Sequence, residues 1–189
     1  MLILASTSRY RRELLTRLRV PFECIAPEVD EALRVGELPQ SRALRLAHAK
    51  AEAVATAYPN AVVIGSDQVA AMGDAVLRKP GSVTRACAQL AQLSGHQADF
   101  HTAVVVKAPA SQTQAHCDHT WVQFRKLDVE SIERYVAAEQ PIDCAGAFKC
   151  EGLGIALFVA IHNQDPTALI GLPLIALASM LRELGFSVP

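Results

Sequence analysis

The side chains of this chain that could do chemistry lie close to the ends of short apolar runs. The segment LILASTSRYRREL places Ser6 directly after the apolar run Leu2–Ala5, and it places Arg11 and Arg12 where a helix-like pattern begins. A helix N-terminus has free N–H groups that attract anions, and arginine adds forked donors that suit phosphate oxygens. The segment predicts a cradle for a polyphosphate. A basic helix start that simply faces water is the alternative.

Carboxylates follow a second apolar run. Asp67 comes directly after VVIGS, and in α/β proteins ligands bind where buried strands end. A carboxylate there could hold a metal ion or polarise a water molecule, or it could simply make a turn. The stretch PEVDE offers Glu31 beside two other acids, which could supply a ligand for a hard cation whose shell is completed by phosphates. A solvated loop is the other interpretation of PEVDE.

Two lysines could neutralise a triphosphate together with these arginines. Lys50 lies beside the apolar stripe of an Ala-rich helical pattern, and Lys79 directly precedes a proline. Each lysine taken alone also fits an ordinary surface position. The phosphate-binding pattern GxxxxGK[ST] and the nucleophile pattern GxSxG are both absent. The run AHCDH does not have the spacing of a zinc motif.

Composition limits the class of protein. The chain has 189 residues, 51% of them hydrophobic, which is enough for a sizeable core. Its formal net charge of −1 gives no overall field that would attract a nucleic acid polymer. Five cysteines without a CxxC pair indicate free thiols rather than a disulfide framework. The start MLILAS lacks a charged segment, and no apolar stretch is long enough to cross a membrane. We therefore expect a soluble, cytoplasmic protein that does not bind membranes.

Strand and helix patterns alternate in the first half, and strand patterns dominate later. This order predicts a mixed α/β protein with an early βαβ-like half and a more antiparallel second half. Ser41 is a candidate cap for the second helix. The expected helices span residues 8–18, 39–57, 83–93, 129–138 and 172–184, and the expected strands span 2–5, 22–27, 61–70, 103–109, 119–127 and 156–163. The expected loops span 110–114 and 144–154, and residues 75–82 form either a hairpin arm or a loop.

Seven motifs occur in one order: LASTSRYRRELL, PEVDE, RLAHAKA, IGSDQV, RKP, CAGAFKCEGLG and LIGLPL. Together they resemble the Maf family of nucleoside triphosphate pyrophosphatases, from about residue 2 to about residue 184. The resemblance implies one domain spanning residues 1–189, with an elongated mixed sheet, helices, and two lobes around a central nucleotide-binding cleft. It also implies hydrolysis between the α- and β-phosphates with a divalent cation, Mg²⁺ or Mn²⁺, and a homodimer.

The resemblance carries functional roles onto single positions. Asp67 takes the place of the family's catalytic base. The positions that match phosphate binding are Ser6, Arg11, Arg12, Lys50 and Lys79, and those that match metal binding are Glu31 and Asp67. Many relatives have proline where this chain has Arg9, and proline preorganises the first position of a helix. Its absence changes the loop but removes no phosphate donor.

Three positions separate the branches of the family, and here they are Tyr10, Gln68 and Glu151. They resemble the branch that hydrolyses 7-methyl-GTP rather than the branch for dTTP and UTP. Methylation at N7 makes guanine cationic, and a cationic ring stacks well on an aromatic face such as Tyr10. Glu151 could accept from two guanine N–H donors, and its charge complements the cation. Tyr10 could instead pack against Leu14 on its own helix.

The sequence thus predicts a pyrophosphatase that converts 7-methyl-GTP to 7-methyl-GMP and pyrophosphate and clears a modified nucleotide. One alternative is a pyrophosphatase for dTTP, UTP or another modified nucleotide. The other alternative is a nucleotide-binding regulator of cell division, whose output is a protein contact. The combination of Glu31, Lys50, Asp67 and Lys79 favours an enzyme.

Overall fold

The computed structural model describes residues 1–189, and it is mixed α/β, as the alternating patterns predict. Its strands are β1 (Leu2–Ala5), β2 (Glu23–Ile25), β3 (Val62–Met72), β4 (Ala75–Leu77), β5 (Gln97–Lys107), β6 (Gln114–Phe124) and β7 (Phe158–His162). Its helices are α1 (Arg9–Thr16), α2 (Pro39–Ala57), α3 (Val83–Leu93), α4 (Val129–Glu139), the 3₁₀ helix η1 (Leu153–Leu157) and α5 (Leu174–Glu183).

The chain forms two compact units. Unit 1 comprises Met1–Gln68, His101–Asp118 and Asp165–Pro189, and unit 2 comprises Val69–Phe100 and His119–Gln164. Strands β3, β5 and β6 contribute residues to both units. The single domain and the central cleft that the family resemblance implies stay predictions.

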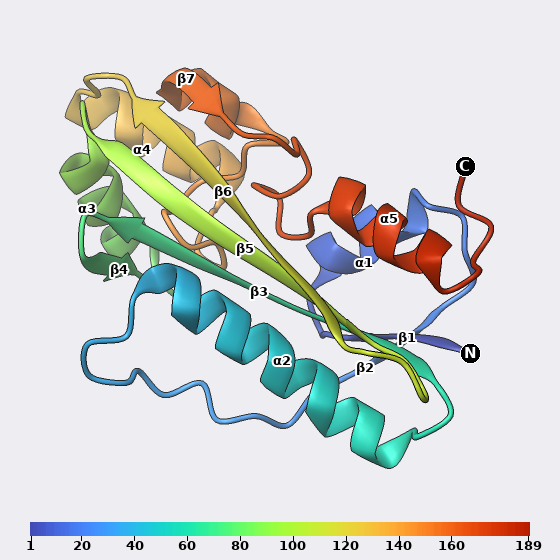
Figure 1. Cartoon of the computed structure of the whole chain (residues 1–189). Coiled ribbons are helices and arrows are strands. Elements are labelled where there is room, and N and C mark those ends of the chain that lie inside the picture. Colours follow the sequence, from blue (N-terminus) through green and yellow to red (C-terminus); the bar gives the residue numbers. More distant parts are fainter. The chain divides into compact units, whose positions relative to one another are not determined.

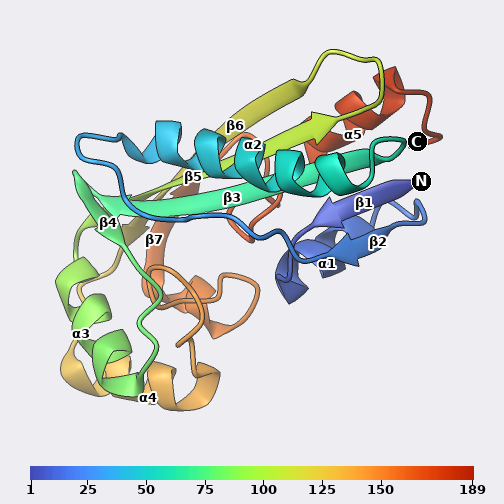
Figure 2. The same ribbon diagram turned by 90° about the horizontal axis from the view of Figure 1, so that it is seen from below.

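Unit 1 opens with the expected βαβ element. Strand β1 pairs in parallel with β2 on one side, where Leu4 lies opposite Cys24, and with β3 on the other side, where Leu4 lies opposite Ile64. Helix α1 connects β1 to β2, and Figure 2 shows the two strands side by side. Parallel strands require such a crossover, so the βαβ prediction is confirmed.

The two faces of β3 in unit 1 contact different helices because successive side chains point to opposite sides of a strand. Ile64 belongs to a core cluster with Leu14 and Leu15 of α1 and Leu177 of α5. Gly65 instead faces α2. Figure 1 shows α1 and α5 next to each other and α2 running along the strands on the opposite side. The even and odd positions of β3 therefore reach different surroundings.

Helix α2 begins and ends at the predicted residues, but its predicted cap is wrong. The N-cap is Leu38, which makes no side-chain capping bond, and Ser41 lies inside the helix. Pro39 supplies the first turn instead, since its fixed φ suits that position and its missing N–H leaves no donor unsatisfied. The buried side of α2 contains Ala47 and Ala51.

The strand pairs β3–β4 and β6–β7 of unit 2 are antiparallel. Strand β4 returns against β3, with Leu77 opposite Ala70, and β7 pairs with β6. Helices α3 and α4 pack against each other (Figure 2), capped by Ser82 and Asp128. The aromatic core of this unit consists of edge-to-face rings of Phe100, Phe124, Phe148 and Phe158.

Several boundaries differ from the sequence prediction. Strands β5 and β6 begin six and five residues earlier than expected: at the start of β5 polar residues such as His101 alternate with buried ones, and the start of β6 from Gln114 to Cys117 contains no buried residue. The loop 144–154 leads into η1 rather than directly into a strand. All five cysteines are free. No helix combines the length and the apolar character needed to span a membrane.

Candidate active site

The end of β1 and the start of α1 form a turn built from serines. Ser6 is buried, and its Oγ accepts a hydrogen bond from the backbone N–H of Ser8 at 3.1 Å. Ser8 is the N-cap of α1, and its side chain accepts from the N–H of Arg11 at 3.4 Å. The N–H groups of Arg9 and Tyr10, in the first turn, lie at the positive end of the helix dipole. The turn is therefore suited to an anion.

Arg11 and Arg12 of α1 have different surroundings. Arg11 donates from Nε to the carbonyl oxygen of Gly171 at 2.9 Å, whereas Arg12 is exposed. Burial lowers the pKa of Arg11 from its ordinary value, and the nearby negative charges of Asp67 and Glu31 act in the opposite direction. Because Nε is used for positioning, the two terminal nitrogens of the guanidinium are the ones available for a ligand.

Asp67 and Lys50 form a buried ion pair. The ammonium nitrogen of Lys50 lies 2.6 Å from Oδ1 of Asp67 and 2.7 Å from Oε1 of Glu31. Lys50 and Asp67 are each 8% exposed, whereas the side chain of Glu31 is 56% exposed. The structure thus brings together two of the predicted carboxylates around one predicted phosphate-binding lysine.

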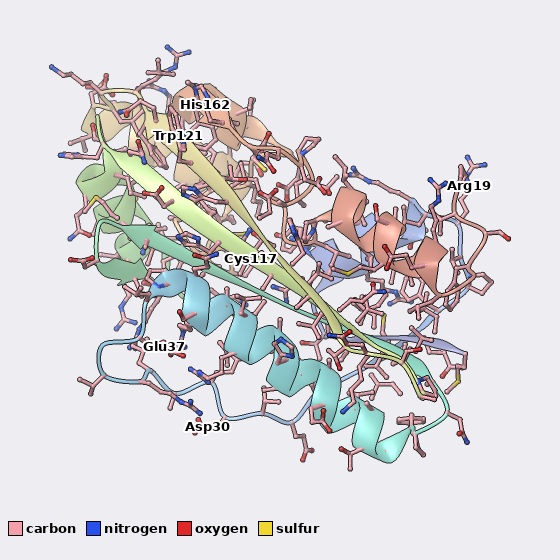
Figure 3. The ribbon with its side chains drawn as sticks, in the orientation of Figure 1. Arg19, Asp30, Glu37, Cys117, Trp121 and His162 are labelled. Atoms are coloured by element: carbon pink, nitrogen blue, oxygen red, sulfur yellow. The ribbon has the colours of Figure 1, made fainter.

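The loop that presents Glu31 is fastened to α2 by arginines. Arg42 donates to the carbonyl oxygen of Glu31 at 2.6 Å, and both Arg42 and Arg45 donate to the carbonyl oxygen of Ala32 at 3.2 Å. Glu37, which ends the same loop beside the first turn of α2 (Figure 3), accepts from Arg45 at 2.5 and 2.7 Å. These contacts hold the backbone of Glu31 while its carboxylate faces Lys50.

Gln68 lies on the other face of β3 from Asp67, as the alternation of the strand requires. Its Nε2 lies 2.9 Å from Oγ1 of Thr102 and 3.0 Å from the carbonyl oxygens of both Ala168 and Leu169. Ser66, on the same face, donates to the carbonyl oxygen of Gly171 at 3.2 Å. The predicted specificity residue Gln68 is therefore held by the segment that precedes α5.

Tyr10 does not pack as a plain core residue. The guanidinium carbon of Arg9 lies 4.7 Å from the centroid of the Tyr10 ring, and Arg9 Nη2 donates to the Tyr10 hydroxyl at 2.8 Å. Arg9 thus places a cation over one face of the ring.

Lys79 and Glu151 belong to unit 2, and both are exposed. Lys79 follows β4, and Glu151 lies in the loop 144–154. That loop is fastened to α4: Lys149 Nζ donates to the carbonyl oxygen of Glu139 at 2.6 Å, and the Glu139 carboxylate accepts from the N–H of Leu153 at 2.8 Å. Burial raises the pKa of the neighbouring Cys150 to about 12, so its thiol is protonated at neutral pH.

Sequence reasoning did not single out several residues that shape this site. Thr102 and Ser66 are fully buried hydroxyls of the central strands, and alternating polarity within an apolar strand is the signal that could have found them. Asp165 and Thr167 bind each other in the segment before α5. The turn signal DPT marks that pair in the sequence.

The carboxylates beside Lys50 could act as ligands for a divalent cation. No cluster of three or more His, Cys, Asp or Glu side chains occurs in the chain, so an all-protein cage is absent. Mg²⁺ instead binds through one or two carboxylates and the substrate's own phosphates. Asp67 and Glu31, which converge on Lys50, fit that mode as a pair of carboxylates, and Lys50 contacts only Oδ1 of Asp67.

A mixed sheet with a buried carboxylate–ammonium pair, next to a helix start rich in anion donors, defines an α/β protein for a phosphorylated ligand. The chain belongs to the Maf-like protein family, whose family model matches residues 1–184. A protein of Xanthomonas axonopodis named 7-methyl-GTP pyrophosphatase is 56% identical over 188 residues, covering 100% of this chain and 98% of that relative. A protein of the same name from Pseudomonas putida is 51% identical over 189 residues, again covering 100% and 98%.

Solved structures support the fold. The Ham1 protein of Staphylococcus aureus superimposes with a TM-score of 0.55 at 16% identity, covering 97% of this chain and 98% of that one. A HAM1 protein from Coxiella burnetii gives a TM-score of 0.52 at 13% identity with the same coverage. At these identities the likeness concerns the fold alone, and the predicted fold class is confirmed.

Proposed function

We propose that this chain is a nucleoside triphosphate pyrophosphatase that hydrolyses 7-methyl-GTP to 7-methyl-GMP and pyrophosphate, and so clears a modified nucleotide. The observation that carries the proposal is the contact of Lys50 with both Asp67 and Glu31, in a chain whose full-length relatives bear that activity in their names. A nucleotide substrate implies a cytoplasmic location in this proposal, and a homodimer and a single functional domain remain the expected organisation.

The start of α1 offers hydrogen-bond donors for the phosphates of the substrate. The terminal nitrogens of Arg11 and the first-turn N–H groups of α1 bind phosphate oxygens, and the hydroxyl of Ser6 can donate its proton there. Arg12 and Lys79 are exposed and add positive charge. These groups hold the α-phosphorus in place for attack, so much of the rate comes from positioning and from charge stabilisation.

Asp67 acts as the base. It accepts a proton from the water molecule that attacks the α-phosphorus, and the bond between that phosphorus and the bridging oxygen of the β-phosphate breaks. Lys50, held against Asp67 at 2.6 Å, fixes the carboxylate in one orientation. A bound Mg²⁺ or Mn²⁺, held by Glu31 and Asp67, would supply neutralisation of the phosphate charge.

In this proposal the nucleobase is distinguished by residues that favour a cation. The ring of Tyr10 stacks on the methylated purine, whose positive charge strengthens the contact relative to guanine. Glu151 accepts from two N–H groups on the edge of guanine, and its negative charge complements the methylated ring. Gln68, anchored through its nitrogen, offers its carbonyl oxygen as an acceptor.

A substrate panel tests the proposal. Pyrophosphate release is measured with Mg²⁺ for 7-methyl-GTP, GTP, dTTP, UTP and CTP at equal concentration, with Asp67→Asn as the control. Preferred hydrolysis of 7-methyl-GTP that the variant loses is the expected result. Preference for dTTP or UTP would support pyrophosphatase activity but would show that 7-methylguanine is not the preferred nucleobase. A tight complex with uncleaved nucleotide in the presence of Mg²⁺ would instead identify a regulator.

A further inference from the structure

The segment Asp165–Leu172, between β7 and α5, turns its backbone carbonyls toward the candidate active site, and we refer to it as the carbonyl segment. The carbonyl oxygen of Gly171 accepts from Arg11 Nε at 2.9 Å and from Ser66 Oγ at 3.2 Å. The carbonyl oxygens of Ala168 and Leu169 each accept from Gln68 Nε2 at 3.0 Å. Three side chains beside or within the predicted phosphate- and base-binding set are therefore held by one stretch of backbone.

These bonds fix what each side chain offers to a ligand. Thr102 uses its hydroxyl proton to donate to the carbonyl oxygen of Ala168 at 3.0 Å, so its oxygen can only accept from Gln68. Gln68 faces three acceptors, and its amide nitrogen must be the atom turned toward them. The amide orientation leaves the carbonyl oxygen of Gln68 as its free recognition group. In the same way, the bond from Nε leaves the terminal nitrogens of Arg11 for an anion.

Asp165 and Thr167 determine the shape of the carbonyl segment. Asp165 is 3% exposed, and its Oδ1 accepts from the N–H of Thr167 at 2.8 Å and lies 2.6 Å from Thr167 Oγ1. Its other oxygen accepts from the N–H of Ile175 in the first turn of α5 at 2.7 Å. Thr167 Oγ1 also lies 2.8 Å from the carbonyl oxygen of Leu172 and accepts from the N–H of Leu174 at 2.9 Å.

We propose that Asp165 and Thr167 are positioning residues for nucleotide recognition: through the carbonyl segment they orient Arg11 toward the phosphates and Gln68 toward the base. Neither residue touches the ligand in this scheme. A buried carboxylate whose donors are removed is costly, so the segment rearranges when the network is broken. Because several site groups depend on the same backbone, that rearrangement weakens phosphate binding and base discrimination together.

The matched substitutions are Thr167→Val and Thr167→Ser. Valine keeps the branched shape of threonine but has no hydroxyl, whereas serine keeps the hydroxyl. Val188→Ala serves as the stability control, since Val188 is buried in the core cluster of unit 1 and its backbone N–H bonds to Phe186, outside the hydrogen bonds of Asp165 and Thr167. Thermal unfolding is measured first for the wild type and the three variants. Their binding is then compared at a temperature at which all four proteins are folded.

Three measurements distinguish a positioning role of Thr167 from a purely structural role, and only one of them depends on the proposed function. Inorganic tripolyphosphate binding by calorimetry reports the phosphate donors without a base or hydrolysis. The ¹⁵N–¹H resonances of the Gln68 amide and of Arg11 Nε report the two anchors directly. Only the ratio of kcat/KM for 7-methyl-GTP to that for GTP rests on the proposed function. A wild-type protein without that preference would reject the base assignment and leave the other two readouts decisive.

We expect Thr167→Val to weaken tripolyphosphate binding about three- to tenfold, the equivalent of about one hydrogen bond. It should also shift both resonances and reduce the 7-methyl-GTP to GTP ratio, while Thr167→Ser restores all three values. Asp165→Asn should have the same effect as Thr167→Val, because an amide offers only one acceptor oxygen. If Thr167→Val loses only thermal stability, as Val188→Ala does, and the resonances and the binding constant stay at wild-type values, the proposal is wrong.

Discussion

The ammonium group of Lys50 lies 2.6 Å from Oδ1 of Asp67, and both side chains are almost completely buried. A buried ion pair is costly to desolvate, and it contributes little net stability compared with apolar packing. Its value here is geometric, because it fixes the orientation of the carboxylate. Glu31 provides Lys50 with a second, exposed partner at 2.7 Å, so the lysine stays compensated when the first contact changes.

Asp67→Asn should abolish most of the activity while the protein still folds. We expect turnover of the preferred nucleotide to fall about 10²–10⁴-fold, because the base that takes the proton of the attacking water is gone. Lys50 keeps Glu31 as a partner, so far-UV circular dichroism should be unchanged. Pyrophosphate release is the measurement. Full turnover by the variant would rule out Asp67 as the base.

Glu31→Gln should raise the Mg²⁺ concentration that gives half-maximal activity. A neutral amide is a weaker ligand for a hard cation than a carboxylate. The matched control is Glu28→Gln, since Glu28 is an exposed acid in the same PEVDE stretch that has no role in the proposed site. Activity is titrated with Mg²⁺ after treatment with a chelator, which should itself remove activity. Equal Mg²⁺ dependence of the two variants would remove Glu31 from the metal site.

Gly65→Ala should damage both stability and activity. A Cβ at Gly65 would lie 2.6 Å from the backbone nitrogen of Ala51 and still closer to the carbonyl oxygen of Ala47. Backbone cannot move aside as a side chain can, so β3 and α2 must separate, and Lys50 moves away from Asp67. We expect a loss of about 1–3 kcal/mol in the free energy of unfolding, measured by urea titration. Wild-type stability with wild-type turnover would contradict this account of the close approach.

Local patterns were sufficient to predict most of the elements. Helices α2 and α3 follow the predicted ranges because their apolar residues repeat with a helical period and a proline or a serine marks the start. The cap of α2 could not be predicted as well, since Ser41 satisfies the composition rule while Pro39 takes the position. The start of β5 was missed because polar residues alternate with buried ones from Gln97, and the start of β6 was missed because no residue from Gln114 to Cys117 is buried.

The candidate site was predictable as a set of residue types but not as a set of contacts. Family motifs indicated Lys50 and Asp67 separately, yet no local rule states that a helix residue and a strand residue 17 positions apart meet at 2.6 Å. The bonds from Arg11 to Gly171 and from Gln68 to Ala168 join residues 160 and 100 positions apart. Such contacts depend on tertiary packing, which periodicity does not encode.

The loop that carries Glu31 should loosen at low pH. The hydrogen bond from Arg45, together with nearby arginine charges, lowers the pKa of Glu37 below its ordinary value of 4.5. A carboxyl whose folded pKa is depressed stabilises the fold above its unfolded pKa, and that contribution is lost as the pH falls through the lower folded pKa. The difference in Tm between wild type and Glu37→Gln should therefore be present at pH 7, begin to shrink near the ordinary pKa of 4.5, and disappear once the pH has fallen below the lowered pKa of Glu37. A difference that is constant with pH would contradict the assignment.

Arg9→Ala should increase the discrimination between 7-methyl-GTP and GTP. Arg9 holds a guanidinium 4.7 Å from the centroid of the Tyr10 ring. A second cation stacked on the ring is then repelled by the first, and two charges about 8 Å apart in water interact by ~0.5 kcal/mol, which corresponds to about a twofold effect. We expect the ratio of kcat/KM for the two substrates to rise about twofold in the variant. Arg12→Ala is the control, because it removes an equal charge without touching the ring and should affect both substrates alike.

An unchanged ratio in Arg9→Ala, with a reduced ratio in Tyr10→Leu, would show that the nucleobase stacks on Tyr10 without sensing Arg9. Unchanged ratios in both variants would separate Tyr10 from base recognition altogether.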